Sequence, residues 1–101
     1  MYLKIIKPSE LESYLRRSKT LLIDIRSLEE YHSSHIEGAI NVPQDCLDRY
    51  FKSADRSKLY ILYCQRGITS LREGKRLAQQ DYRIGTLAGG FSVYDRNRKS
   101  R

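Results

Sequence analysis

One cysteine in the sequence is followed by a loop that could favour a reactive sulfur anion. Cys64 comes directly after a continuous apolar run, residues 59–63, and shortly before a segment with a helical pattern, residues 69–80. Backbone N–H groups between the two could converge on the sulfur, and the helix N-terminus would add partial positive charge. Because a thiolate is a far better nucleophile than a thiol, this arrangement predicts that Cys64 is a catalytic nucleophile. The residues expected to bind substrate around it are Gln65, Arg66, Gly67, Ile68, Thr69 and Ser70.

Some of these loop residues have a more specific expected role. A tight loop that directs several N–H groups inward needs backbone angles that most side chains disfavour, and this is the role predicted for Gly67. Arg66 would offer a full positive charge to an anionic substrate, and Thr69 or Ser70 is expected to cap the helix. Taken singly, a buried cysteine, a solvated arginine and a helix cap would need no function. Their occurrence together in one short loop favours a site.

Other polar residues are predicted to serve the scaffold. Asp24 and Arg26 are two positions apart at the end of an apolar run, so their side chains point the same way. We expect Arg26 to pair with a nearby acid such as Glu30 and to fix the turn from strand to helix. His35 is expected to bond to nearby backbone. Cys46 is predicted to be an ordinary helix cysteine, with a resolving thiol as the alternative.

The segments around the loop alternate between strand and helix. A capping-box spacing at Ser9 and Glu12 predicts one helix start, and the same spacing at Ser27 and Glu30 predicts another. Continuously apolar runs are typical of strands covered on both faces, as in parallel sheets. The expected strands are residues 3–6, 20–25, 39–43, 59–63 and 83–87, with helices opening at 8–12 and 27–30 and covering 45–54 and 69–80, and a turn at 89–90. This order predicts an α/β sandwich with a mainly parallel sheet, in which ligands bind beyond the carboxyl ends of the strands.

Length and composition limit the classes of protein that fit. The chain has 101 residues, 40% hydrophobic and 31% charged, which is typical of one soluble globular domain. No apolar run approaches the roughly 20 residues that cross a bilayer, and the first residues lack the apolar stretch of a secretory signal. We therefore expect a cytoplasmic protein with no membrane partner. Two cysteines without a Cys-x-x-Cys pair argue against a disulfide framework and against a zinc site, so neither is expected.

The net charge of +7 is concentrated at one end of the chain. The last six residues carry four positive charges, and +7 less these four leaves +3 for the rest. We therefore divide the chain into a domain over residues 1–95 and a basic tail over residues 96–101, which is expected to be a frayed, solvated end. No nucleic-acid partner is expected, because a solvated helix face explains Arg72, Lys75 and Arg76 better than a binding surface does.

Several motifs resemble those of the rhodanese-like domains, and together they span nearly the whole chain. Residues 22–26 resemble that family's opening strand motif, and residues 29–31 with 35–43 resemble its next signature. Residues 87–91 resemble its closing motif, which is usually followed by a tryptophan where this chain has Tyr94. The resemblance implies a three-layer α/β sandwich with a mainly parallel central sheet of about five strands, flanked by helices. It also implies scaffold roles for Asp24, Arg26, Glu30, His35 and Gly38.

In the Cys64 loop, the resemblance is to the thiosulfate-using branch, which favours a basic residue two positions after the cysteine, here Arg66. Many single-domain members carry an arginine where this chain has Thr69. The resemblance implies a sulfurtransferase that moves sulfane sulfur from thiosulfate or a similar small anion to a thiol or cyanide, through a Cys64 persulfide and without a cofactor. A protein could replace the small donor or acceptor. The alternative is a sulfur-relay or regulatory partner-binding module with little activity on small donors.

Cysteine phosphatases also place a thiolate in an anion cradle between a strand and a helix. Their Cys-x5-Arg pattern would require an arginine at position 70, where this chain has Ser70. A phosphoryl group would therefore lack its bidentate clamp, which argues against a phosphatase.

Overall fold

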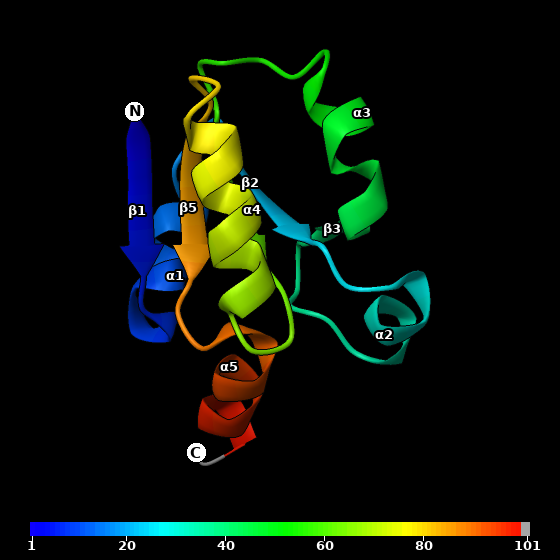
Figure 1. Cartoon of the computed structure of the whole chain (residues 1–101). Coiled ribbons are helices and arrows are strands. Elements are labelled where there is room, and N and C mark those ends of the chain that lie inside the picture. The colour runs from blue at the N-terminus through cyan, green and yellow to red at the C-terminus, as the bar shows by residue number, and fades with distance from the viewer. Residues whose placement is uncertain (100–101) are drawn as a thin grey trace.

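A computed structural model describes residues 1–99, in which five parallel strands form one sheet. In space the strands follow the order β1-β5-β4-β2-β3. Helices cover both faces of the sheet, so the three-layer α/β sandwich that the sequence predicts is confirmed (Figure 1). The strands are β1 (Tyr2–Ile6), β2 (Thr20–Asp24), β3 (Ile40–Asn41), β4 (Leu59–Tyr63) and β5 (Arg83–Leu87). The helices are α1 (Pro8–Leu15), α2 (Leu28–Ser33), α3 (Leu47–Phe51), α4 (Ile68–Ala78) and α5 (Gly90–Lys99), with a 3-10 helix η1 (Gln44–Cys46) before α3.

The central strand β4 is buried along its whole length. Side chains alternate between the two faces of a sheet, so β4 contributes to two hydrophobic cores. Tyr60 and Leu62 pack in the core that contains residues of α3 and α4. Ile61 and Tyr63 pack in the core that contains residues of α1 and α5. Burial on both faces explains why this strand is a continuous apolar run in the sequence.

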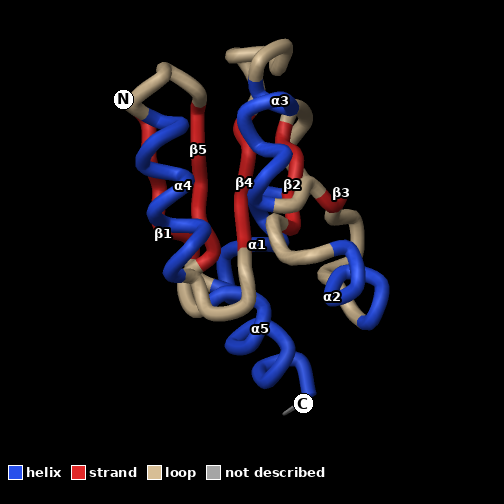
Figure 2. Tube along the Cα trace, turned by 45° about the vertical axis from the view of Figure 1, so that its right-hand side comes forward, coloured by secondary structure: helices blue, strands red, loops and turns tan. Residues whose placement is uncertain are grey.

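The carboxyl ends of the central strands lie at the same edge of the sheet (Figure 2). Asp24 at the end of β2 is in register with Tyr63 at the end of β4, and the N–H of Ile25 donates to the carbonyl of Tyr63 at 3.0 Å. The residues that follow β2 and β4 therefore leave the sheet side by side. This places Cys64 next to the segment that follows β2.

The first helix starts earlier than the sequence predicts. α1 begins at Pro8, and the carboxylate of Glu10 accepts a hydrogen bond from the N–H of Lys7 at 2.9 Å. The capping box predicted at Ser9 and Glu12 is therefore wrong, because proline fits the first helical position and shifts the start. At α2 the predicted box is confirmed. There the N–H of Glu30 donates to Oγ of Ser27 at 3.2 Å, and the N–H of Ser27 donates to the Glu30 carboxylate at 3.3 Å.

The chain after β5 differs most from the sequence-based expectation. Beyond the turn at Gly89, residues 90–99 form helix α5, where only a turn and apolar residues were predicted. Residues 96–99 are helical rather than frayed, and Asp95 forms ion pairs with Arg98 at 2.8 Å and with Lys99 at 3.0 Å. These i,i+3 and i,i+4 pairs stabilise the helix end. Residues 100–101 of the predicted tail lie outside the described residues.

Two further segments are shorter than predicted. The expected strand over residues 39–43 is reduced to β3, which pairs only with the end of β2. The expected helix over residues 45–54 is η1 followed by α3, which ends at Phe51. Among the described residues, no helix is long and apolar enough to cross a membrane.

Candidate active site

The sulfur of Cys64 lies at the start of the loop between β4 and α4, and two backbone N–H groups point at it. Gly67 donates to Sγ at 3.1 Å and Ser70 donates at 3.3 Å. The thiol in turn donates to the hydroxyl oxygen of Ser70 at 3.4 Å. Cys64 is 7% exposed. Converging amides of this kind stabilise negative charge, so the loop forms a partial anion cradle around one nearly buried sulfur.

The cradle depends on the backbone conformation of Gly67. This residue has a φ of +90° and is the N-cap of α4, with no side-chain hydrogen bond closing the helix start. A Cβ here would lie 3.0 Å from the backbone nitrogen of Gly89, so both the angle and the space favour glycine. The expected cap at Thr69 or Ser70 is wrong. Both residues lie inside the first turn of α4, where the N–H of Ser70 is turned toward the sulfur instead.

The start of α5 holds the other side of the loop. The N–H of Phe91 donates to the carbonyl of Cys64 at 2.9 Å, and the N–H of Ser92 donates to the carbonyl of Gln65 at 3.0 Å. Gly90 lies so close that a Cβ there would approach the Cys64 carbonyl oxygen to 2.5 Å. With these carbonyls directed at α5, the N–H of Gly67 is left to face the sulfur. Helix α5 is the part of the site that sequence reasoning missed.

A buried arginine connects the end of β2 to the cysteine loop. Arg26 forms an ion pair with Asp24 at 2.8 Å, and both side chains are buried. Its guanidinium also donates to the amide oxygen of Gln65 at 3.0 Å and to the carbonyl of Ser34 at 2.6 Å. Burial alone would lower the pKa of Arg26, but the hydrogen bond to Asp24 and the charge of Asp24 outweigh it and raise the pKa.

Arg26 does pair with a nearby acid, as the sequence predicts, but this acid is Asp24 and not Glu30. Glu30 lies in the capping box of α2, bonded to Ser27, while Asp24 takes the guanidinium. The cause is the two-residue spacing along an extended chain, which puts Asp24 and Arg26 on one side. Because both charges are buried and paired, the pair is a fixed scaffold element that positions the side chain of Gln65.

A hollow of about 360 Å³ opens at Cys64. Gln65 of the loop and Thr69 in the first turn of α4 line it, and so do two acidic residues, Glu30 and Asp45. Among the described residues, Arg26 is the one cation in this lining, and its charge is already balanced by Asp24. The remaining residues that line the hollow are Ile25, Ser27, Pro43 and Gln44.

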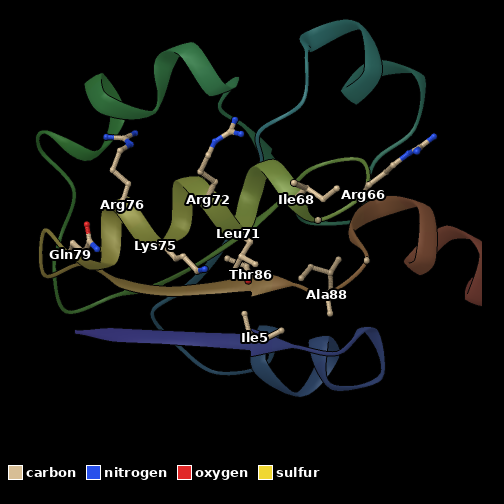
Figure 3. Close-up of a pocket in the computed structure, with 13 residues that line it drawn as sticks. Ile5, Arg66, Ile68, Leu71, Arg72, Lys75, Arg76, Gln79, Thr86 and Ala88 are labelled. Atoms are coloured by element: carbon tan, nitrogen blue, oxygen red, sulfur yellow. The ribbon is translucent and has the colours of Figure 1, made fainter.

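The structure does not bring Arg66 into the hollow at Cys64. Its side chain is exposed and, together with Ile68, lines a second hollow on the other side of the loop. Figure 3 shows Arg66 extending outward from the loop. An irregular loop can turn consecutive side chains in different directions, which the spacing from Cys64 does not reveal.

A family comparison assigns this architecture. The model of the rhodanese-like domain matches residues 7–97 of the chain. The chain belongs to the rhodanese-like domain family. It is 27% identical over 95 residues to the thiosulfate sulfurtransferase GlpE of Coxiella burnetii, an alignment that covers 93% of this chain and 89% of that protein. It is 26% identical over 92 residues to the protein of the same name in Shewanella oneidensis, covering 90% of this chain and 91% of the relative.

Solved structures share the fold of this rhodanese-like domain. A rhodanese-related protein from Thermoplasma volcanium superposes with a TM-score of 0.83 over 93% of this chain and 92% of its own, at 23% identity. The CoADR-RHD protein of Bacillus anthracis superposes with a TM-score of 0.87 at 24% identity, covering 98% of this chain and 18% of that protein. The family model and the folds thus agree over nearly the whole chain.

The remaining scaffold residues of this rhodanese-like domain lie outside the hollow at Cys64. His35 stacks on Tyr31 with ring centroids 3.8 Å apart, and its Nδ1 lies 2.8 Å from the Tyr31 carbonyl. Gly38 has a φ of +89° in the turn before β3. The hydroxyl of Tyr63 accepts a hydrogen bond from the N–H of Ile36 at 3.1 Å, and burial above all raises the pKa of this tyrosine. Within residues 1–99 no group of three or more His, Cys, Asp and Glu residues could hold a metal ion.

Proposed function

We propose that this rhodanese-like domain is a sulfurtransferase that carries sulfane sulfur as a persulfide on Cys64. The donor is thiosulfate or a similar small anion, and the acceptor is a thiol or cyanide. The observation that carries the proposal is the pair of N–H groups, from Gly67 and Ser70, that point at the Cys64 sulfur. The thiosulfate sulfurtransferases among its relatives support the same donor.

The reaction has two displacement steps at sulfur. In the first, the Cys64 thiolate attacks the outer sulfur of thiosulfate, the sulfur–sulfur bond of the donor breaks, and sulfite leaves with the bonding electron pair. The product is a persulfide anion on Cys64. In the second step an acceptor thiolate or cyanide attacks the outer sulfur and the Cys64 thiolate is released. Negative charge therefore stays in the loop throughout, where the amides of Gly67 and Ser70 stabilise it.

Side chains around Cys64 are expected to bind or attract the anionic donor. Gln65, held by Arg26, and Thr69 line the hollow and offer polar contacts to a bound donor. Arg66 lies outside this hollow, so it attracts the anionic donor through its charge rather than through a direct clamp.

A second candidate function is a sulfur relay in which a protein persulfide replaces thiosulfate. Two carboxylates, Glu30 and Asp45, line the hollow, and like charges disfavour a doubly negative donor. A persulfide on another protein carries less charge and would meet less repulsion. We also propose that the protein acts in the cytoplasm, where reducing conditions keep Cys64 as a free thiol.

Steady-state kinetics with thiosulfate and cyanide test the proposal. A persulfide mechanism predicts parallel lines in double-reciprocal plots, because donor and acceptor react in separate steps. The Cys64→Ser variant is expected to have no activity, and the Cys46→Ser variant is expected to retain it. Intersecting lines, or turnover by Cys64→Ser, would contradict the mechanism. Loading of Cys64 by glutathione persulfide without any turnover of thiosulfate would favour the relay.

A further inference from the structure

A second and larger hollow runs between α4 and the edge strand β1. It has a volume of about 590 Å³ and starts at the cysteine loop, where Gly67 and Ile68 line it. Figure 3 shows Leu71 and Lys75 reaching from α4 toward β5, with Ile5 pointing up from β1. We call this hollow the α4–β1 groove; its other lining residues are Arg66, Arg72, Arg76, Gln79, Thr86, Leu87, Ala88 and Gly89.

The floor of the α4–β1 groove leaves apolar side chains uncovered. Ile5 is in register with Thr86 and shares a sheet face with Leu3, which packs against the core of α3 and α4. α4 covers this face over β5 but not over the end of β1, so Ile5 is 52% exposed. Ile68, in the first turn of α4, is 72% exposed. In an α/β sandwich, the space beside a helix on a sheet face is the position of another helix.

The rim of the α4–β1 groove is positively charged. Its lining contains four cations and, among the described residues, no carboxylate. Arg76 is neutralised by ion pairs with Asp48 at 2.6 Å and Glu73 at 2.7 Å. Within the described part of the chain, Arg66, Arg72 and Lys75 form no ion pair. An apolar floor below unpaired cations is complementary to a segment that is apolar on one face and acidic on the other.

We propose that the α4–β1 groove binds an acidic amphipathic helix of a partner protein. The helix would lie beside α4, cover Ile5 and Ile68 with its apolar face, and pair its carboxylates with Lys75 and its neighbours. A second copy of this chain is disfavoured as the occupant, because its net charge of +7 would repel another copy. Nucleic acid fits less well, because an apolar floor offers nothing to phosphates.

The position of the groove gives the bound partner a role. Gly67 lines the groove and also donates its N–H to the sulfur of Cys64. A helix bound there would end beside the cysteine loop, so a segment that continues from this helix around the loop could bring a persulfide, as donor, or a thiol, as acceptor, to the hollow at Cys64. This role rests on the proposed function and identifies the partner as a protein that gives sulfur to Cys64 or takes sulfur from it; the binding itself does not depend on sulfur transfer.

Fluorescence anisotropy with the full chain tests the binding. The probe is a labelled peptide of about 16 residues, long enough to form a helix, with leucines on one face and glutamates on the other. Ile5→Glu and Lys75→Glu are each expected to weaken binding about tenfold. Two matched controls are expected to bind like the wild type: Ile40→Glu on the opposite edge strand β3, and Lys52→Glu at the end of α3. Circular dichroism of each variant verifies that it is folded.

Several results would overturn the docking proposal. A scrambled peptide of the same composition that binds equally well would show that the binding is unspecific charge attraction. The same would follow if Lys75→Glu weakened peptide binding and Ile5→Glu did not. A DNA oligonucleotide that displaces the peptide from the wild type, and that itself no longer binds to Ile5→Glu, would assign the groove to nucleic acid. Dimerisation in sedimentation experiments that Ile5→Glu abolishes would assign it to a second copy.

The test separates this inference from the proposed function. The Cys64→Ser variant is expected to bind the peptide like the wild type, because Cys64 is not part of the groove lining. Ile5→Glu is expected to turn over thiosulfate like the wild type, because Ile5 does not line the hollow at Cys64. Peptide binding by a protein that does not form a persulfide would leave the docking site standing while the sulfurtransferase proposal failed.

Discussion

Negative charge on the sulfur of Cys64 would be stabilised first by main-chain groups. The amides of Gly67 and Ser70 lie 3.1 and 3.3 Å from Sγ, whereas Arg66 lines a different hollow. A main-chain donor is set by the loop conformation and does not depend on the side chain at its position. The identity of the loop residues therefore matters mostly through the backbone angles they allow and through the charge they add at a distance.

At the residue scale, Arg66→Ala separates long-range attraction from direct binding. Because the Arg66 side chain is exposed and outside the hollow, we expect kcat/KM for thiosulfate to fall by only about threefold to tenfold, mainly through KM. The loss should shrink at about 0.5 M salt, where exposed charges are screened. Arg49→Ala is the control, because Arg49 is also an exposed arginine but lies on α3, outside the lining of either hollow. A loss that persists at high salt would indicate direct contact with the donor, and no loss at low salt would remove Arg66 from the mechanism.

Helix α5 and helix α4 hold the cysteine loop from two sides. In α5, the N–H groups of Phe91 and Ser92 donate hydrogen bonds to the carbonyls of Cys64 and Gln65. In α4, the first turn directs the N–H of Ser70 at the sulfur. Neither helix needs a catalytic side chain for this role. Their contribution is tested by substitutions that disturb packing at a helix end.

At the element scale, Gly90→Ala is expected to lower the rate of sulfur transfer by more than about tenfold and to destabilise the domain, because φ here is +63°. The added Cβ would meet the Cys64 carbonyl oxygen at 2.5 Å and would push the loop away. Gly38→Ala is a matched control. Gly38 has a φ of +89° but no atom within 4 Å of a Cβ, so only the cost in stability is expected. Equal effects of the two variants on transfer would show that contact between α5 and the loop is unimportant.

Glu73 links α4 to the 3-10 helix η1 and makes this link dependent on pH. Burial would raise its pKa, but hydrogen bonds from Arg76 and Gln44 outweigh burial and lower it. A pKa that is lower in the folded protein means stabilisation that is fully present above the unfolded value of about 4.3 and is lost as pH falls through the folded value.

The corresponding prediction concerns Glu73→Gln in urea unfolding experiments. At pH 7 we expect this variant to be less stable than the wild type by about 1 kcal/mol, because the 2.7 Å ion pair with Arg76 is lost. The difference should be smaller at pH 3 than at pH 7, because protonation of Glu73 removes the same charge from the wild type. Glu12→Gln is the control: Glu12 forms an exposed ion pair with Arg16 at 3.9 Å, and its loss should have no effect at either pH. A difference that is the same at both pH values would contradict the assignment.

For the whole molecule, the sequence predicts the sheet better than the helices that surround the site. β2 and β4 are recognisable because both of their faces are buried along most of their length, which favours continuous apolar runs. The position of Cys64 at the end of β4 follows from this. α5 is not recognisable, because its residues include glycine, valine, asparagine and aspartate, which have low helix propensity. Tertiary contacts, such as the hydrogen bond from Phe91 to the Cys64 carbonyl, form this helix instead.

Side-chain directions in the site could be predicted only where a regular element sets them. Asp24 and Arg26 share a side of an extended segment, so the two-residue spacing is enough to predict their pairing. The direction of Arg66 depends on the positive φ of Gly67 and on the approach of Gly89 and Gly90, which lie more than 20 residues further along the chain. Spacing within the loop carries no information about such distant contacts.

The sheet order brings Cys64, Arg26 and the start of α5 together from three distant parts of the chain, and the proposed sulfur transfer depends on an anionic sulfur at Cys64. Mass spectrometry of the intact protein after incubation with thiosulfate and removal of excess donor tests this claim most directly. We expect a gain of one sulfur atom that maps to the peptide containing Cys64 and is absent in Cys64→Ser. A protein that gains no sulfur from thiosulfate or from glutathione persulfide, or that gains it on Cys46 instead, would contradict it.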